Sequence, residues 1–199
     1  MKAPLLNIRT LNLTVNILEA EAPAVTILPS VKDQFTEALK KFAPDSLTPP
    51  AIGEYWIGQG GIYAGRREYP EGLCYVIFAA ADVGKHAYGE HGTEVEAISR
   101  HDGRENTAIL VNRDGSHPAA DAAYAYTCDG HNDFSLPSIG ELNHAWQFIH
   151  ESFEKDWYIS STQRSAYYAF GMVFGDGIQG YYGKNCERRV RPVRRLPIQ

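Results

Sequence analysis

The sequence predicts an α+β domain of short strands, about two helices and long loops, preceded by a small β/α appendage. Three observations lead to this fold class. Glycine and proline are frequent, with 18 and 11 copies in 199 residues, and they separate short apolar runs. One long amphipathic helix with a capping signal is expected at residues 139–152. After it, the chain returns to short β-like runs divided by turns.

The start of the chain is predicted to form a separate appendage. Residues 8–17 alternate apolar and polar side chains, which indicates a half-buried strand. Ser30 is placed as the N-cap of a short amphipathic helix. A polar, proline-rich linker follows at 45–50. We therefore expect a docking or appendage segment over 1–45 and one main domain over 46–199.

The first half of the main domain is rich in glycine and short apolar runs. The glycines between Gly58 and Gly65 indicate tight turns, since the Lys-Ser/Thr ending of a phosphate-binding loop is missing. In chain order we then expect a buried strand at 73–81, a long ordered loop at 82–106, a strand at 108–111 and a helix at 118–126.

The clearest local signal is a capping box. Ser138 caps a helix and Glu141, three residues later, reaches back to the cap. The apolar stripe of this helix consists of Ile139, Leu142, Trp146, Ile149 and Phe153. Four short strands are expected after it, at 157–161, 167–174, 177–182 and 189–194.

Composition excludes several classes of protein. The net charge is −5, and the arginine-rich run 188–195 alternates with apolar residues like a strand with one buried face, so no nucleic acid is expected. No run approaches the roughly 18 apolar residues of a membrane span. Without a signal-peptide pattern, folding in a cytoplasm is expected. Of three cysteines, Cys74 is placed in the core, and pairing of Cys128 with Cys186 is left open.

Four segments carry a resemblance to a known family. Residues 133–142 read DFSLPSIGEL, 157–162 read WYISST, 190–194 read VRPVR and 53–65 read GEYWIGQGGIYAG. In order and spacing they resemble the collagen-like adhesin C-terminal domain family, including its phage and prophage members, over residues 51–196. The resemblance implies a C-type-lectin-like fold related to the formylglycine-generating-enzyme fold.

The match departs from the family pattern at two aromatic positions. Phe134 stands where the family has tryptophan, and the tryptophan of the strand motif is displaced to Trp157, with Tyr158 in its usual place. The matched residues describe a frame, in which Trp157 and the last strand are expected to bury against the capped helix. They do not define a ligand site, so function has to be argued from the loops.

The resemblance places the binding face between the WYISST strand and the terminal strand. This segment contains two tyrosine pairs, and a period of two predicts one core and one exposed ring in each. Exposed tyrosines beside polar groups favour a recognition surface, and ordinary strand packing is the alternative. The candidate ligand-binding residues are Gln163, Arg164, Tyr167, Tyr168, Gln179, Tyr181, Tyr182, Lys184 and Asn185.

No resident cofactor is expected. Asp129, His131 and Asp133 alternate and are candidate calcium ligands, because C-type lectins often use calcium and calcium prefers oxygen ligands. The alternative is that this Asp/Asn/Gly cluster only forms a turn. The sequence has no zinc-protease, nucleophile-elbow or kinase motif, and the copper-binding cysteine pair of the formylglycine-generating relatives has no evident counterpart.

We therefore expect a non-enzymatic phage tail protein that binds a bacterial cell-surface receptor, either a glycan or an outer-membrane protein. It would assemble in the host cytoplasm, act in the virion, contact other tail proteins and form a homo-oligomer, with a trimer favoured. Two alternatives remain: a structural tail or baseplate decoration protein, and the variable protein of a diversity-generating retroelement.

Overall fold

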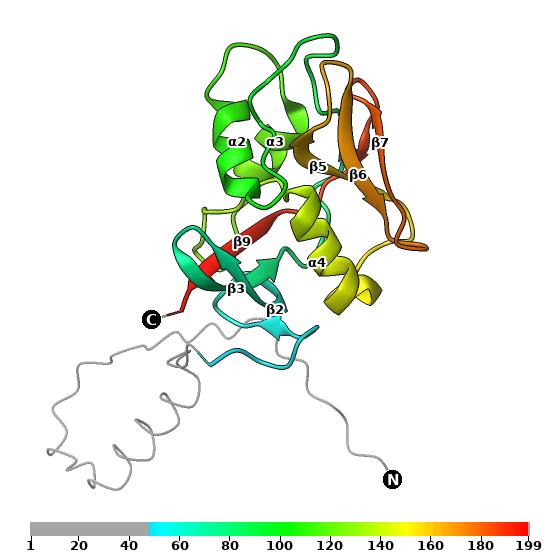
Figure 1. Cartoon of the computed structure of the whole chain (residues 1–199). Helices are drawn as coiled ribbons and strands as arrows, with labels where there is room; N and C mark the ends of the chain where they lie inside the picture. Colours follow the sequence, from blue (N-terminus) through cyan, green and yellow to red (C-terminus); the bar gives the residue numbers. More distant parts are fainter. Residues whose placement is uncertain (1–47, 199) are drawn as a thin grey trace, which may run out of the picture. The chain divides into compact units, whose positions relative to one another are not determined.

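The computed structural model describes residues 48–198, and the predicted appendage over 1–45 lies outside this range. In the described part the fold is mixed α+β, as the sequence predicts, and it contains three α-helices and two sheets. Helix α4 (Ile139–Ile149) lies between the two sheets, while α2 (Gly103–Val111) packs on β5 and α3 (Pro118–Tyr124) packs on α2 and β4 (Figure 1). None of the helices described here combines the length and hydropathy that crossing a bilayer requires.

The first sheet joins the two ends of the described domain. Its strand order is β1-β2-β3-β9, with β1 at Tyr55–Trp56, β2 at Gly61–Tyr69, β3 at Gly72–Phe78 and β9 at Val193–Pro197. All its pairings are antiparallel, and β3 meets β9 with Val76 opposite Arg195. The strand expected at 73–81 is thus confirmed as β3, with Cys74 fully buried in it.

The second sheet displays the strands of the candidate site. Its order is β4-β8-β5-β6-β7, with β4 at Lys85–His86, β8 at Arg188–Arg189, β5 at Trp157–Gln163, β6 at Tyr168–Val173 and β7 at Gln179–Gly183. Only the β5–β8 pairing is parallel, at Tyr158 opposite Arg189. Strand β7 is the edge strand of this sheet, so the β6–β7 hairpin lies at the surface of the domain.

Helix α4 confirms the predicted capping box. The Ser138 hydroxyl accepts from the Glu141 amide at 3.2 Å, and the Glu141 carboxylate accepts from the Ser138 amide at 2.7 Å. The same carboxylate accepts from the Tyr69 hydroxyl at 2.8 Å and the Gly103 amide at 3.0 Å. One buried side chain therefore ties α4 to β2 and to the start of α2. The helix ends at Ile149, and a 3-10 turn continues it to Ser152.

The strand expected at 108–111 is wrong, because these residues form the last turn of α2. Asp102 caps this helix by accepting from the Glu105 amide at 3.0 Å. The helix also begins in what was expected to be loop. The helix expected at 118–126 is confirmed as α3.

The arginine-rich end of the chain is also more buried than its pattern suggests. It divides into β8 and β9 instead of one strand, and Arg191, Arg194 and Arg195 are buried. Each of them pairs with carboxylates, Arg191 with Asp82 and Arg194 with Asp133. These ion pairs explain how arginines can be buried at positions where the alternation of arginine and apolar residues predicted exposed side chains.

Candidate functional site

The candidate site is built on one face of the β6–β7 hairpin. Tyr168 and Phe170 lie two apart in β6, and Phe170 is paired in register with Tyr181 of β7, so all three side chains share a face. The rings of Tyr168 and Tyr181 meet edge-to-face with centroids 5.3 Å apart. Farther along the same face Met172 is buried in the core cluster of α4, whereas Tyr168 and Tyr181 remain 40% and 49% exposed.

Two exposed arginines lie over the rings of this face. The Arg164 guanidinium carbon is 3.9 Å from the Tyr181 ring centroid, and that of Arg100 is 4.9 Å from the Phe170 centroid. Within residues 48–198, neither guanidinium has a carboxylate at ion-pair distance. We call the surface formed by Arg100, Arg164, Tyr168, Phe170 and Tyr181 the tyrosine face.

A tight turn joins β5 to β6 beside this face. The amides of Arg164 and Ser165 both donate to the Tyr168 carbonyl, at 2.9 and 3.1 Å. Tyr167 lies in this turn, 53% exposed, with its ring against His91 at 5.3 Å between centroids. The prediction that one ring of this first tyrosine pair is core is therefore wrong, because strand alternation begins only at Tyr168.

The second tyrosine pair does divide between two faces. Tyr181 is exposed, and Tyr182 is half-buried on the opposite face, edge-to-face with Trp157 at 4.5 Å. The Arg188 guanidinium covers the Tyr182 ring, and burial raises the pKa of the Tyr182 hydroxyl. Trp157 thus packs away from α4, contrary to the expectation that it buries against the capped helix.

Two predicted ligand-binding side chains point into the interior. The Lys184 ammonium donates to the Thr93 carbonyl at 2.6 Å and to the Gln163 side-chain oxygen at 2.5 Å, and the Gln163 amide donates to the Val95 carbonyl at 2.9 Å. Burial lowers the pKa of Lys184 to about 8. Both side chains are buried, so in this arrangement they hold the loop around residues 93–95 against the sheet and do not reach a ligand at the surface.

Gln179 and Asn185 flank the tyrosine face. The Gln179 side-chain oxygen accepts from the Asn143 amide at 2.9 Å. Asn185 occupies the space beside Gly183, where an added Cβ would meet its side-chain oxygen at 2.6 Å. Because Gly183 is opposite Tyr168, its missing side chain makes room for Asn185 there.

Six of the nine predicted residues therefore lie on the tyrosine face or next to it, and the structure adds two more to the face. Alternation from Tyr168 would have identified Phe170. Arg100 comes from a loop more than sixty residues earlier in the chain, and no local signal indicates it. The six predicted surface residues are Arg164, Tyr167, Tyr168, Gln179, Tyr181 and Asn185.

The three candidate calcium ligands form hydrogen bonds to other residues of the protein. The Asp129 carboxylate accepts from the Tyr55 hydroxyl and from the Gly58 amide, both at 3.0 Å, and Asp133 accepts from Arg194 at 2.7 Å. His131 bonds to the Gly58 carbonyl at 2.9 Å. In the part of the chain with described coordinates, no three metal-ligating side chains group together. Cys128 and Cys186 are both free thiols here.

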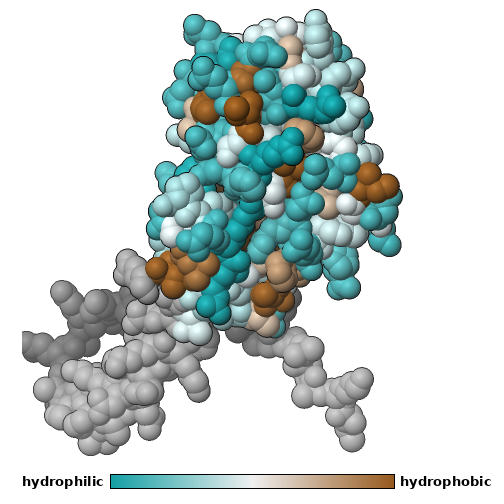
Figure 2. Space-filling model, viewed as in Figure 1, coloured by the Kyte–Doolittle hydropathy of each residue, from teal (hydrophilic) through white to brown (hydrophobic). Residues whose placement is uncertain are grey.

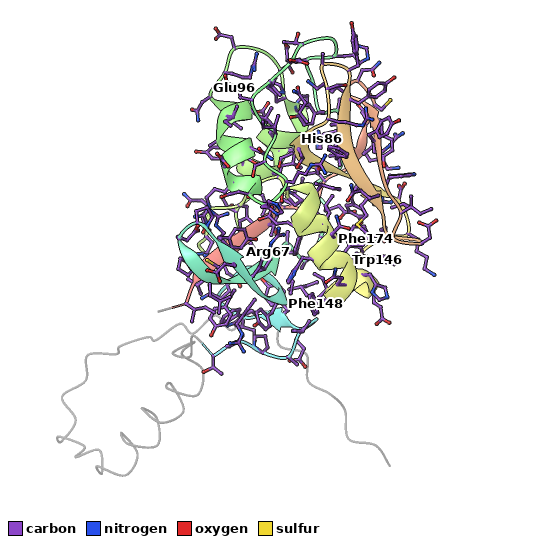
Figure 3. The ribbon with its side chains drawn as sticks, viewed as in Figure 1. Arg67, His86, Glu96, Trp146, Phe148 and Phe174 are labelled. Carbon is purple, nitrogen blue, oxygen red and sulfur yellow. The ribbon has the colours of Figure 1, made fainter. Side chains whose placement is uncertain are left out.

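A hollow lies at the other end of the same hairpin. It encloses about 400 Å³ beside the last turn of α4. Trp146 and Phe174 lie side by side there, with Phe148 on the same helix (Figure 3) and the first two rings 5.9 Å apart. Its rim mixes His150, Glu151 and Lys155. Opposite charges at this rim leave no single charge preference, in contrast to the tyrosine face.

In the view of Figure 2 the hydrophobic side chains of the described residues occur in small separate groups among hydrophilic ones, which is ordinary for a protein surface. The comparison with protein-family models gave no match, and the comparison with curated proteins gave none either. Function has therefore to be argued from the geometry of the tyrosine face.

Proposed function

We propose that this protein is a non-enzymatic ligand-binding domain that recognises a bacterial cell-surface ligand, glycan or protein, through the tyrosine face. The observation that carries the proposal is the exposed Tyr181 ring under the guanidinium of Arg164, which pairs with no carboxylate between residues 48 and 198. Such a surface offers flat apolar area, hydroxyls and guanidinium donors together. It therefore suits ligands that both stack and form hydrogen bonds.

The rigidity of the face supports a binding role. Tyr168 and Tyr181 are held by five consecutive register pairs between β6 and β7, and the turn before Tyr168 is closed by two amide hydrogen bonds. Lys184 fastens a neighbouring loop from beneath. A ligand would meet side chains that are already ordered, so binding costs less conformational entropy than it would on a loose loop.

The fold and its setting belong to the same proposal. Pairing of the early β2–β3 hairpin with the final strand β9, around a long intervening segment, is compatible with a C-type-lectin-like frame. The sequence resemblance to phage and prophage domains favours a tail protein of the virion. There it would bind a surface receptor, contact other tail proteins and repeat as a homo-oligomer, trimer favoured, that gains strength by avidity.

Coating of bacterial cells tests the proposal. Fluorescently labelled full-length protein is incubated with a broad panel of Gram-negative and Gram-positive strains, and bound fluorescence is measured. We expect at least one strain to be coated, and Tyr181→Ala to lower coating at least tenfold without changing the circular dichroism spectrum. Removal of a central aromatic contact typically costs more than 1 kcal/mol of binding free energy.

Tyr124→Ala is the matched control. Tyr124 is 58% exposed on α3, outside the tyrosine face, and the substitution removes the same side chain. We expect its coating to equal that of the wild type. Failure of the folded wild type to coat any strain, or equal loss from both variants, would refute binding through this face. A protein that only decorates a tail would give the first of these results.

A further inference from the structure

The charge of the tyrosine face differs from that of the whole chain. The sequence has 24 acidic and 19 basic residues and a net charge of −5. Even so, no described carboxylate lies within ion-pair distance of Arg100 or Arg164. Nor does either guanidinium donate a hydrogen bond to any residue between 48 and 198. The guanidiniums of Arg100 and Arg164 therefore lie over rings of two adjacent strands, β6 and β7, with no neutralising carboxylate among the described residues.

The position of the two guanidiniums leaves their donors open. Each lies over a ring, Arg164 over Tyr181 and Arg100 over Phe170. These rings are direct partners across β6 and β7, so they are about 5 Å apart at the backbone. A guanidinium over an aromatic ring keeps its N–H edge available, and this edge matches the two oxygens of a carboxylate or phosphate.

The remainder of the face suits a sugar ring. Tyr168 presents an exposed ring next to Tyr181, and Asn185 and Gln179 place polar groups at the two ends of this surface. Aromatic faces accept the apolar side of a pyranose, while amide groups meet its hydroxyls. Anion donors and a stacking ring thus occur within one hairpin.

Resting on the proposed function, we infer that the ligand is an acidic polysaccharide whose carboxylates are bound by Arg164 and Arg100 while a sugar ring stacks on Tyr168. A phosphate-bearing glycan would offer a similar anion. The carboxylate is favoured because the planar guanidinium edges and a neighbouring ring match a sugar that carries its acid group directly on the ring.

Binding to defined polysaccharides tests this inference. The probes are polygalacturonate, alginate and hyaluronate, each beside its methyl ester, which keeps the sugar rings and removes the charge, together with a phosphomannan. Full-length protein is titrated in biolayer interferometry. We expect at least one polyuronate to bind, with its ester at least tenfold weaker, and added salt to weaken binding further. Equal binding of acid and ester, or binding of phosphomannan alone, would overturn the inference.

Matched variants test whether polyuronate binding depends on the tyrosine face. Arg164→Gln should weaken polyuronate binding about tenfold or more, as expected for one lost hydrogen-bonded charge contact. Arg164→Lys should recover little of it, because an ammonium keeps the charge but loses the planar fork. Lys155→Gln changes the net charge by the same amount at an exposed position near the opposite end of the hairpin, and this variant should bind like the wild type. Equal loss from Arg164→Gln and Lys155→Gln would indicate only long-range attraction and contradict the inference.

The test of the acidic ligand can fail or succeed independently of the test of the binding role. Strains that are coated through Tyr181 while none of the three polyuronates binds would keep the binding role and overturn the acidic ligand. Soluble polyuronate that displaces the protein from coated cells would support both.

Discussion

The arginines of the C-terminal segment and those of the tyrosine face have the same side chain in opposite surroundings. Arg195 is buried and donates to Asp102 at 2.7 and 3.0 Å and to Glu71 at 3.0 Å. Arg191, equally buried, pairs with Asp82 and donates to three backbone carbonyls. Arg164 is exposed over Tyr181 and pairs with no described carboxylate.

This difference separates structural arginines from available ones. A buried guanidinium pays a large desolvation cost and persists only with carboxylates and carbonyls around it, so its donors are already used. An exposed guanidinium needs no such partners, so its donors remain free for a ligand. Lys184 is a third case, a buried cation that donates to Thr93 and Gln163 but to no carboxylate of the described domain.

The largest expected effect is on the stability contribution of Arg195. Arg195→Gln leaves Asp102, which also caps α2, without its ion-pair partner and leaves Glu71 with only the more distant Arg104 at 3.9 Å. Breaking a buried ion pair on one side costs about 3–5 kcal/mol. Urea unfolding followed by circular dichroism should show a loss of this size. A loss below about 1 kcal/mol would mean that burial does not make this arginine structural, and the comparison would fail.

Local signals in the sequence were enough for the frame around α4. The Ser138–Glu141 box predicted this helix because capping needs only four consecutive residues. Nothing local indicates that Glu141 also meets Tyr69 and Gly103, which are 72 and 38 residues away. Helix α2 was missed because its polar residues resembled a loop. One of them, Asn106, is satisfied by Ser161, 55 residues later.

The candidate site divides in the same way. Alternation within β7 correctly placed the two rings of this pair on opposite faces, but it did not indicate that Tyr181 is the exposed one and Tyr182 the half-buried one. The burial of Lys184 was not predictable, because it depends on Thr93 in a loop ninety-one residues away. The position of Arg100 over Phe170 was not predictable either, because it also depends on contacts between distant segments of the chain. Strand periodicity therefore assigned faces, while the charges around those faces depended on long-range packing.

A smaller effect should appear in the pH dependence that Lys184 confers. Its pKa is lowered to about 8 by burial, against 10.5 for an ordinary lysine. Between these pH values the unfolded chain binds the proton and the folded protein does not, so stability rises with pH across this window. The cost of burying the Lys184 ammonium is fully present below about pH 8. Relative to Lys184→Met, the free energy of unfolding of the wild type should rise by about 1–3 kcal/mol between pH 8 and 10.5.

Urea titrations of both proteins at several pH values measure this gain. Tyrosine titration toward pH 10 and above is shared by the two proteins and cancels in the difference. A flat difference across the window would show that the Lys184 ammonium is as well solvated in the folded protein as in the unfolded chain. Lys184 would then belong with the exposed cations of the tyrosine face.

The smallest expected effect is on the stability contribution of Arg164. Arg164→Gln, the same substitution as at Arg195, should change the free energy of unfolding by no more than about 0.5 kcal/mol, as exposed positions usually do. The stacking on Tyr181 contributes little there, since an exposed cation–π contact is worth about 0.5–1 kcal/mol and glutamine keeps part of the packing. Urea unfolding beside the Arg195 variant tests this directly. A loss near that of Arg195→Gln would make Arg164 structural. Near-native stability with weakened polyuronate binding would show that freedom from carboxylates is what leaves this arginine available.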